Sequence, residues 1–555
     1  MKVLVYGSGG RDHCLSDKYG DSQHVKKVYF APGNPGVLHT PKGKRGLIER
    51  APLKNFGEVV DFCVEKGVDL VDVGSENPLE KGLVDVLVER GIRAIGPISE
   101  YVQLESDRAF TKVLLRMAGV PVAAYRAFSD PEKARKYVRN IGYPVVVKAN
   151  GLAAGKGALV CDDISQAEDA IAEIMVQKVF GKSGDRVLVE ERKYGTEISF
   201  FVYLDGEHVL PLQYFAQDFK RAFDPDDKER IEQFGGNPNT GGLGCYCPHS
   251  LCTPSLVSRI MKEIVNPTVD TLYNKLGWNY KGVLYFGLNL DDRGDLCVFE
   301  INVRHGDPEW EVLSRKLSTD LFEIGSAVWE GTLDQIEPVW NSQYYIDVVA
   351  VEGRSKATRG WNPGYPKRYG KYHKITGLEK IGKGIAVYFS GVAENNDGEL
   401  ITDGGRVFHI VAGAPTLEEA RKKAYRNIRK IRFIDHNNND ENCMRFLRAI
   451  GGERVFYLSE INPCITLDME LFLATMADIA EGYQVDQLDE YLGIRHGKLK
   501  MDLKKVEKHL ISELGLEQIQ MEIKEDKCDI HFRLGDPMGR HKEAHLLDMK
   551  LKSPS

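Results

Sequence analysis

Short apolar segments that end in glycine-containing loops dominate the first hundred residues of the chain. Residues 2–6, 28–30 and 69–73 each have the length and composition of a buried strand. Between them, apolar residues follow helical spacing over 56–66 and 79–90. Strands that alternate with helices predict a doubly wound parallel sheet, whose ligands bind at the carboxyl ends of the strands. We therefore expect an N-terminal α/β domain with its glycine loops facing a ligand.

Composition narrows the classes of protein to which the chain can belong. Its 555 residues are enough for about three or four domains, and 42% hydrophobic with 28% charged residues is typical of globular proteins. A net charge of -7 gives no overall attraction to nucleic acid or anionic membranes. No apolar run approaches the ~20 residues that span a bilayer. The 10 cysteines are scattered without a Cys-x-x-Cys pair, as in a reducing compartment. We expect a cytoplasmic protein without nucleic-acid or membrane partners.

The first glycine-rich loop, Gly7-Ser8-Gly9-Gly10-Arg11-Asp12-His13, joins a strand to a helix. Such a loop exposes backbone amides at a helix N-terminus, which favours an anion such as phosphate. Asp12 stands where a dinucleotide fingerprint would need a third glycine. Taken alone, the loop fits a phosphate site and a tight structural turn equally well.

A second loop, residues 151–157, follows the apolar segment 145–147 and contains three glycines and Lys156. It is not a Walker loop, because the glycine spacing and the Ser or Thr after the lysine are missing. Its exposed amides and lysine nevertheless suit a triphosphate, while a flexible loop without a ligand is the alternative. Lys148 at the end of a buried strand favours the triphosphate, because an internal lysine needs an anionic partner.

Glu300, Asn302 and Arg304 alternate along a predicted strand, so their side chains should share one face. Carboxylate and amide oxygens are ligands that Mg²⁺ prefers, and an arginine beside them can hold a phosphate or carboxylate. The apolar residues between them also fit an ordinary strand with one solvated face.

Two further segments carry groups that suit a small polar substrate. Residues 237–244 are rich in glycine and supply backbone donors. Residues 217–221 contribute one carboxylate, Asp218, and two cations, Lys220 and Arg221. Each segment alone is weak evidence for a site.

Taken in order, these elements resemble the glycinamide ribonucleotide synthetase family of the ATP-grasp superfamily. The resemblance spans roughly residues 1–450. The motifs that carry it are GSGGRDH, APGNPG, VVVKANGLAAGKG, VEER, QDFKR, NPNTGGLGCY, EINVRHGDPE and ITDGGRVFHIVAGAPTLEEARKKAY. Because their order is preserved along the chain, the match is more specific than any single glycine loop.

The resemblance implies an α/β fold with separate domains. A substrate-binding, doubly wound parallel sheet domain is expected over 1–101, and α+β ATP-grasp domains over 102–330, with a lid at about 123–188. A β-rich C-terminal domain is expected over 331–450. Residues 451–555 exceed the usual length of the family, and we expect a small α+β appendage there.

The appendage has its own pattern in the sequence. Apolar spacing predicts helices over 471–480 and 503–514 and a strand pair over 519–523 and 530–534. A role in packing or oligomerisation and a regulatory role are both open.

The resemblance also implies a reaction. The family joins the carboxylate of glycine to the amine of 5-phosphoribosylamine in purine biosynthesis, through glycyl phosphate, and releases ADP and phosphate. ATP and Mg²⁺ or Mn²⁺ would be required, the partners would be small molecules, and the chain could be a monomer or a dimer. A sister ATP-grasp ligase with another amino acid or amine is the alternative.

Family positions carry over to this chain residue by residue. Those implied for ATP are Arg108, Lys148, Gly155, Lys156, Gly157, Glu190, Glu191, Lys193 and Glu197. Those implied for the other substrates are Gly9, Gly10, Arg11, Asn239, Thr240, Gly241, Gly242 and Asp307. Glu300 and Asn302 are implied metal ligands, and the catalytic residues are Lys148, Asp218, Arg221 and Arg304.

Several residues depart from the usual family pattern. Arg108 replaces a lysine, and Asn289 replaces a methionine and could add an oxygen to the metal site. His305 replaces a phenylalanine, and Trp310-Glu311 replaces Thr-Gln. The side chains at 305 and 310 would either narrow the amino-acid pocket or face the core.

Overall fold

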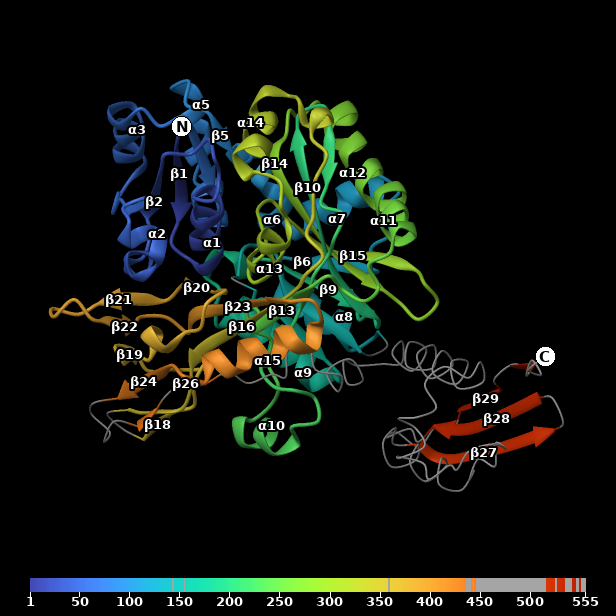
Figure 1. Ribbon diagram of the computed structural model, residues 1–555. Coiled ribbons are helices and arrows are strands. Elements are labelled where there is room, and N and C mark those ends of the chain that lie inside the picture. The colour runs from blue at the N-terminus through green and yellow to red at the C-terminus, as the bar shows by residue number, and fades with distance from the viewer. Residues whose placement is uncertain are drawn as a thin grey trace, which may run out of the picture. The chain divides into compact units, whose positions relative to one another are not determined.

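The computed structural model describes residues 1–141, 144–153, 155–357 and 360–435, together with short strands beyond them. The chain divides into two compact units, Met1–Asn462 and Pro463–Ser555. Figure 1 shows the elements of each unit. The predicted boundaries within the first 450 residues remain predictions.

The N-terminal sheet has the order β3-β2-β1-β4-β5, and all of its pairs are parallel. Its strands are β1 (Lys2–Gly7), β2 (Lys27–Pro32), β3 (Ile48–Arg50), β4 (Leu70–Val73) and β5 (Ala94–Ile95). The helices of this region are α1 (Gly10–Tyr19), α2 (Pro41–Lys44), α3 (Phe56–Lys66), α4 (Glu76–Glu80) and α5 (Leu83–Glu89). The predicted doubly wound parallel sheet is confirmed. The single helix predicted over 79–90 is wrong, because Gly82 adopts a φ of 81° and separates two helices.

Two antiparallel sheets follow. The first has the order β6-β9-β7-β8, with β6 (Tyr125–Phe128), β7 (Val145–Ala149), β8 (Ala158–Cys161) and β9 (Val187–Glu191). The second has the order β11-β10-β14-β15, with β10 (Thr196–Asp205), β11 (Val209–Pro211), β14 (Lys281–Leu290) and β15 (Leu296–Asn302). Their helices are α6 (Gln103–Ser106), α7 (Arg108–Met117), α8 (Pro131–Val138), α9 (Ile164–Ile171), α11 (Pro254–Ile260), α12 (Asn266–Asp270), α13 (Glu309–Lys316) and α14 (Leu321–Glu330).

A β-bulge interrupts the pairing of β14 with β15. Gly287 lies opposite Glu300, but the next residue, Leu288, lies opposite Val298, so Phe299 is the extra residue. A bulge of this kind breaks the regular alternation of faces along a strand. Glu300, Asn302 and Arg304 all line one cavity, as their alternation predicts, but Phe299 and Ile301 line it as well.

The C-terminal part of the first unit is rich in strands, as predicted. One sheet runs β12-β13-β16-β23-β20, with β12 (Gln217–Asp218), β13 (Gly244–Cys247), β16 (Tyr344–Glu352), β20 (Ile385–Phe389) and β23 (Arg406–Ala414). Helix α15 (Leu417–Ile428) packs on β16 and β23 (Figure 1). A further sheet contains β19 (Lys374–Thr376), β21 (Val392–Glu394), β22 (Leu400–Thr402), β24 (Arg432–Asp435) and β25 (Glu441–Asn442). Outside these sheets are β17 (Ser355–Lys356), β18 (Trp361–Asn362) and α10 (Lys228–Phe234).

The second unit contains a sheet of β27 (Leu516–Lys524), β28 (Lys527–Leu534), β29 (Lys542–His545) and β30 (Met549–Lys550). The strand pair predicted over 519–523 and 530–534 is confirmed, because β27 and β28 pair antiparallel. The helices predicted over 471–480 and 503–514 lie outside the described residues.

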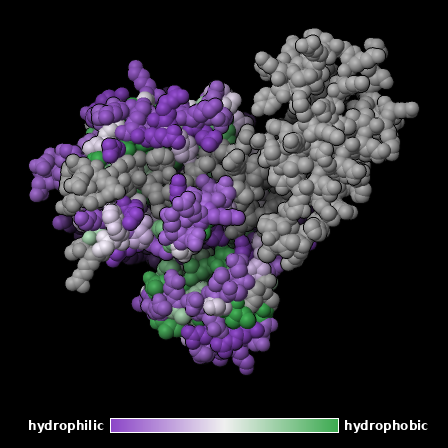
Figure 2. Space-filling model, turned by 90° about the horizontal axis from the view of Figure 1, so that it is seen from below, coloured by the Kyte–Doolittle hydropathy of each residue, from purple (hydrophilic) through white to green (hydrophobic). Residues whose placement is uncertain are grey.

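The described surface is mostly hydrophilic in the view of Figure 2, with apolar residues gathered in small patches. Among the described residues, no helix combines the length and the apolarity needed to cross a membrane.

Candidate active site

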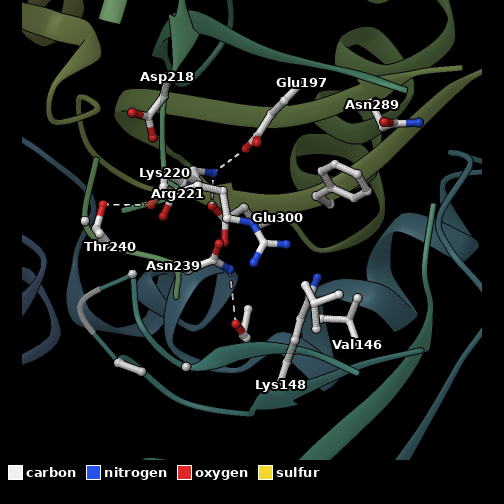
Figure 3. Close-up of a pocket in the computed structure, with 18 of the residues that line it drawn as sticks. Val146, Lys148, Glu197, Asp218, Lys220, Arg221, Asn239, Thr240, Asn289 and Glu300 are labelled. Atoms are coloured by element: carbon white, nitrogen blue, oxygen red, sulfur yellow. Dashed lines mark hydrogen bonds and ion pairs between the residues drawn. The ribbon is translucent and has the colours of Figure 1, made fainter. Parts of the chain in front are cut away.

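A cavity of about 490 Å³ is lined by residues from all three regions of the first unit. Figure 3 shows Lys148 and Val146 on one wall, with Glu197, Asp218 and Glu300 facing them. The predicted residues that line it are Arg11, Arg108, Lys148, Gly155, Gly157, Glu190, Glu191, Lys193, Glu197, Asp218, Arg221, Asn239, Thr240, Gly241, Glu300, Asn302, Arg304 and Asp307. The predicted residues absent from this lining are Gly9, Gly10, Lys156 and Gly242.

Strand β7 ends with a buried lysine that has the anionic partner its position requires. Lys148 Nζ lies 2.9 Å from Glu190 Oε2 on the neighbouring strand β9. Lys112 on α7 approaches the same oxygen at 3.3 Å. Burial raises the pKa of Glu190, but the two lysines more than offset this and lower it. One buried carboxylate thus faces two cations, and Glu190 Oε1 accepts no hydrogen bond.

Glu300 lies at the centre of the cavity among cations. Its Oε2 accepts from Arg108 Nη1 at 3.0 Å, and its Oε1 lies 3.7 Å from Lys220 Nζ. Burial raises the pKa of Glu300, whereas Lys220, Arg108 and Lys148 hold it far below its usual range. Lys220 also pairs with Glu197. The carboxylate is therefore ionised and available to a cation at neutral pH.

Asn302 completes the predicted pair of metal ligands on β15. Its Oδ1 accepts from Arg304 Nη2 at 3.3 Å, while its buried Nδ2 has no hydrogen-bond partner. The donor set of one carboxylate and one amide oxygen fits a hard divalent cation. Asn289 lines the same cavity, and its Nδ2 donates to the carbonyl of Tyr194 at 2.9 Å.

Arg304 is held by two carboxylates that the sequence reasoning did not single out. Its Nη2 lies 2.9 Å from Glu105 Oε1, and its Nε lies 3.2 Å from Glu76 Oε2. The other oxygen of Glu105 accepts from the backbone amide of Val303 at 2.9 Å. Glu76 follows β4 at the carboxyl end of the parallel sheet, so its place in the topology was a usable signal.

The first glycine loop is shaped by Asp12. Its Oδ2 accepts from the backbone amides of Ser8 and Gly9 at 2.9 Å each. A Cβ at Gly7 would lie only 2.2 Å from Asp12 Cγ, so this turn needs glycine. Arg11 projects from α1 into the cavity and donates to the carbonyl of His305 at 3.2 Å.

Asp218 and the 240–242 turn form the wall opposite the lysines. Asp218 Oδ1 is buried without a hydrogen-bond partner, and burial together with Glu309 raises the pKa of Asp218 well above its usual value. A Cβ at Gly242 would lie 2.8 Å from Asp218 Oδ1, and the φ there is 98°. The absence of a side chain at Gly242 therefore leaves room for the Asp218 carboxylate in this wall. Thr240 donates to the carbonyl of Lys220 at 2.8 Å.

Arg406, another residue that the sequence reasoning missed, comes from β23 in the C-terminal sheet. Its Nη1 lies 2.9 Å from Asp307 Oδ1 and donates to the carbonyl of Gly241 at 2.5 Å. Tyr365 accepts from the amide of Gly241 at 3.0 Å. Lys156 lies with its Nζ 5.1 Å from the centre of the Tyr365 ring. The C-terminal region thus contacts the loop that carries the small-substrate residues.

His305 and Trp310 face the core. Their rings lie 4.1 Å apart between centroids, and both side chains are buried outside the lining of the cavity. His305 Nε2 lies 2.6 Å from Tyr203 Oη. Of the two predicted alternatives, narrowing of the amino-acid pocket is therefore excluded for these side chains.

Known proteins resemble this chain along most of its length. It matches the Phosphoribosylglycinamide synthetase N domain over residues 1–105, the ATP-grasp (A) domain over 106–310 and the C domain over 361–438. A phosphoribosylamine–glycine ligase of Archaeoglobus fulgidus is 40% identical over 480 residues, which covers 81% of this chain and 99% of the relative. That of Vibrio vulnificus is 39% identical over 442 residues, which covers 79% and 97%.

A solved structure agrees with these relatives. The crystal structure of phosphoribosylamine–glycine ligase from Thermotoga maritima superposes with a TM-score of 0.64 at 28% identity, and covers 81% of this chain and 99% of that one. The N, A and C domain matches together cover more than half of the chain in the order that the motifs predict. The chain therefore belongs to the phosphoribosylglycinamide synthetase family.

Proposed function

We propose that the chain is an ATP-dependent ligase that joins the carboxylate of glycine to the amine of 5-phosphoribosylamine, and releases ADP and phosphate, as a step of purine biosynthesis. One observation carries the proposal. A single cavity brings together a cationic wall around Lys148, the oxygen donors of Glu300 and Asn302, and the N-terminal Arg11. These are the groups that a phosphoryl transfer between ATP and a second, phosphorylated substrate requires.

The cationic wall would bind the triphosphate. Lys148 and Arg108 present positive charge to the cavity, and the Gly155–Gly157 loop offers backbone amides beside them. The remaining residues assigned to ATP, Glu190, Glu191, Lys193 and Glu197, line the same cavity, with Lys193 Nζ 2.9 Å from Glu191. Fixed cations aligned before the reaction lower the barrier of phosphoryl transfer without reorganisation.

Glu300 and Asn302 would hold the Mg²⁺ or Mn²⁺ ion that accompanies ATP. The ionised carboxylate and the neighbouring amide oxygen fit such an ion. When bound, the ion would neutralise charge on the phosphate oxygens.

The acceptor side would use the start of α1. Gly9 and Gly10 lie at the N-terminus of this ten-residue helix, where amides and the helix dipole favour a phosphate. Arg11 adds a buried guanidinium beside it, and Arg304 shares Glu76 with Arg11 and donates to Asn302. We assign Asp307 and the 239–242 turn to the two small substrates.

The chemistry follows from the need for a leaving group. An amine cannot displace oxide from a carboxylate, but it can displace phosphate once the carboxylate is phosphorylated. Lys148, Arg221 and Arg304 would balance the charge of the acyl phosphate, and Asp218 would orient the amino group of glycine. The attacking amine is nucleophilic when unprotonated, so no side-chain base is needed for the attack itself.

The described wall supports glycine as the acid. Gly241 and Thr240 bring backbone close to the cavity, and the departures at 305 and 310 lie in the core. No observation on the cavity wall favours the alternative ligase with a bulkier amino acid.

Glycine-dependent release of ADP in the presence of freshly made phosphoribosylamine tests the proposal. We expect ADP release to require both substrates and Mg²⁺, with alanine and serine far poorer than glycine. Faster ADP release with a bulkier amino acid, or release that does not depend on phosphoribosylamine, would replace this substrate assignment by another.

A further inference from the structure

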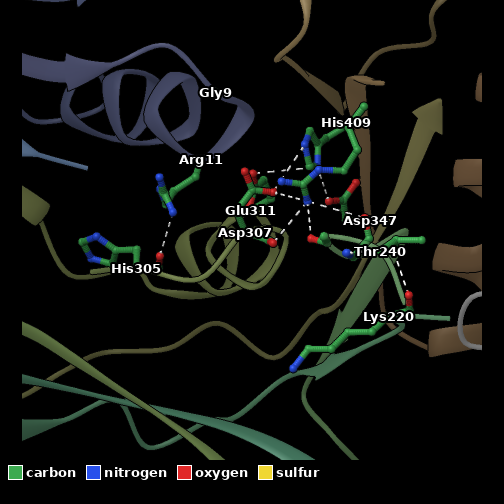
Figure 4. Close-up of polar contacts among 12 residues, drawn as sticks. Gly9, Arg11, Lys220, Thr240, His305, Asp307, Glu311, Asp347 and His409 are labelled. Atoms are coloured by element: carbon green, nitrogen blue, oxygen red, sulfur yellow. Dashed lines mark hydrogen bonds and ion pairs between the residues drawn. The ribbon is translucent and has the colours of Figure 1, made fainter. Parts of the chain in front are cut away.

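Four ionisable side chains meet in the protein interior below the first glycine loop (Figure 4). We call Asp307, Glu311, Asp347 and His409 the buried acidic cluster. Asp307 precedes α13, Glu311 lies on α13, Asp347 on β16 and His409 on β23. His409 Nδ1 lies 2.7 Å from Asp347 Oδ2, and its Nε2 lies 3.7 Å from Asp307 Oδ1. Glu311 Oε1 lies 3.8 Å from His409 Nδ1.

Each member of the cluster has a buried polar atom without a hydrogen-bond partner, and Asp307 Oδ1 and Asp347 Oδ1 are two of these atoms. Both carboxylate oxygens of Glu311 lack one, although its side chain is 0% exposed. His409 Nε2 lacks one as well, and that ring is also 0% exposed. Leaving such groups unpaired away from water destabilises the folded protein. The two side chains therefore indicate a further partner at this point.

The charges of the cluster indicate whether that partner is a cation or an anion. Arg406 is the cation that contacts it, with Nη1 2.9 Å from Asp307 Oδ1. Three acidic side chains thus stand beside one contacting guanidinium, so the cluster favours a cation over an anion.

The donor atoms specify the kind of cation. Asp307, Glu311 and His409 each offer one ligand atom, and these atoms lie within 4.8 Å of one another. Asp347 Oδ2 accepts a hydrogen bond from His409 Nδ1, which is how a carboxylate commonly orients a histidine that binds metal through its other nitrogen. Two oxygens with one imidazole suit Mn²⁺ or Zn²⁺ better than Mg²⁺.

We propose that Asp307, Glu311 and His409 bind a divalent transition-metal ion, with Asp347 orienting the histidine. This site is built from other residues than Glu300 and Asn302, and shares only Asp307 with the residues assigned to the small substrates. It lies against the first glycine loop, because a Cβ at Gly10 would come within 2.5 Å of His409 Nε2 and 3.2 Å of Glu311 Oε1. A bound ion would tie α13 to the C-terminal sheet beside the start of α1.

Metal content and calorimetry of the full chain test the site. The protein is stripped with a chelator and then equilibrated with Mn²⁺ or Zn²⁺ in excess Mg²⁺ without nucleotide. We expect one ion per chain by mass spectrometry of the metal, and a higher melting temperature with the ion than without it. Absence of a stoichiometric ion from the wild-type protein overturns the proposal.

Two variants locate the ion. Glu311→Gln keeps the shape of the side chain and removes its charge, so we expect at least a 30-fold loss of affinity. The matched control is Glu323→Gln, in an exposed triplet with His24 and Asp320 that has the same donor types. We expect it to change affinity by less than threefold.

The remaining outcomes contradict the proposal. An ion that survives Glu311→Gln, or that is lost in Glu323→Gln, binds elsewhere. If Glu311→Gln does not fold, His409→Gln replaces it with the same expected loss. Substitution by Co²⁺ gives a second readout. The visible absorption of the bound Co²⁺ should change in the Glu311 or His409 variant and stay unchanged in the control.

Discussion

The cationic wall of the cavity and the buried acidic cluster both keep carboxylates away from water, but they balance the charge of those carboxylates differently. On the cationic wall, Glu190 faces two lysines, and Glu300 faces Arg108 and Lys220. In the cluster, Arg406 contacts Asp307 and His409 contacts Asp347, and no lysine or arginine forms an ion pair with Glu311 among the described residues. The first region is neutralised by the chain itself, so a single substitution should unbalance it. The second depends on something that the chain does not supply.

Glu300→Gln should have the largest effect. It removes the charge that faces Arg108 and Lys220 and one of the two proposed metal ligands, so several kcal/mol of charge stabilisation is lost. We expect kcat to fall about 1,000-fold or more, measured as glycine-dependent ADP release. An unchanged melting temperature controls for folding. Turnover near that of the wild type at ordinary Mg²⁺ would contradict the assignment.

Lys148→Met breaks the buried pair with Glu190 but leaves Lys112 beside that carboxylate. Because Lys112 still offsets the charge, we expect a loss of about 3 kcal/mol of unfolding free energy at most. The catalytic loss should be greater, about 100-fold in kcat/KM for ATP. Urea unfolding and steady-state kinetics separate the two effects. The double variant Lys148→Met with Glu190→Gln should regain stability but not activity. If it regained activity as well, Lys148 would act only through Glu190.

Asp72, a buried carboxylate on β4 of the N-terminal sheet, is a third case for this comparison. Burial raises its pKa to about 7, while a hydrogen bond from Tyr19 at 2.7 Å opposes the shift. The folded state therefore binds an extra proton between roughly pH 4 and 7, and stability is lost as pH rises through 7. We expect Asp72→Asn to remove about 3 kcal/mol of this pH dependence at most, at 1.36 kcal/mol per pKa unit. Chemical unfolding of both proteins at pH 5 and pH 8 measures it. Equal slopes with pH in the two proteins would mean that Asp72 ionises normally.

The smallest effect is expected at His305. His305→Phe removes the contact with Tyr203 but changes no atom of the cavity lining. The ratio of kcat/KM for glycine to that for alanine should stay within about threefold, with about 1 kcal/mol lost in stability. Gly241→Ala is the contrast, because its methyl group would stand at the wall, 3.2 Å from Arg406 Cζ. Glycine turnover should fall at least tenfold there. A large change of specificity at His305 alone would mean that the core shapes the pocket.

The fold could be predicted where local patterns decide it. The alternation of strands and helices in the N-terminal hundred residues gave the parallel sheet, because buried strands and amphipathic helices have distinct periods. The break at Gly82 was missed because apolar spacing continues across it, and only the positive φ ends the helix. The bulge at Phe299 was missed for a related reason, since its cause is pairing with β14 rather than anything in β15.

The candidate site could be predicted as far as its residues sit in contiguous motifs. Lys148, Glu300 and Arg304 were found in this way, and they line the cavity. Glu76 and Arg406 were not, because their partners lie 228 and 99 residues away and only the tertiary fold brings them together. The buried acidic cluster could not be predicted for the same reason, because its members come from a helix, the segment before that helix and two strands.

The bulge in β15 makes the site sensitive to the length of the chain as well as to its residues. Because Phe299 is the extra residue, Phe299 and Glu300 can both face the cavity. Deleting Phe299 would remove the bulge and restore an uninterrupted ladder with β14. Because faces alternate along a regular strand, the residues before or after the deletion would then have to shift to the opposite face. A chain shortened there by one residue would keep every charged group of the site in its sequence and still lose the arrangement that lets them meet.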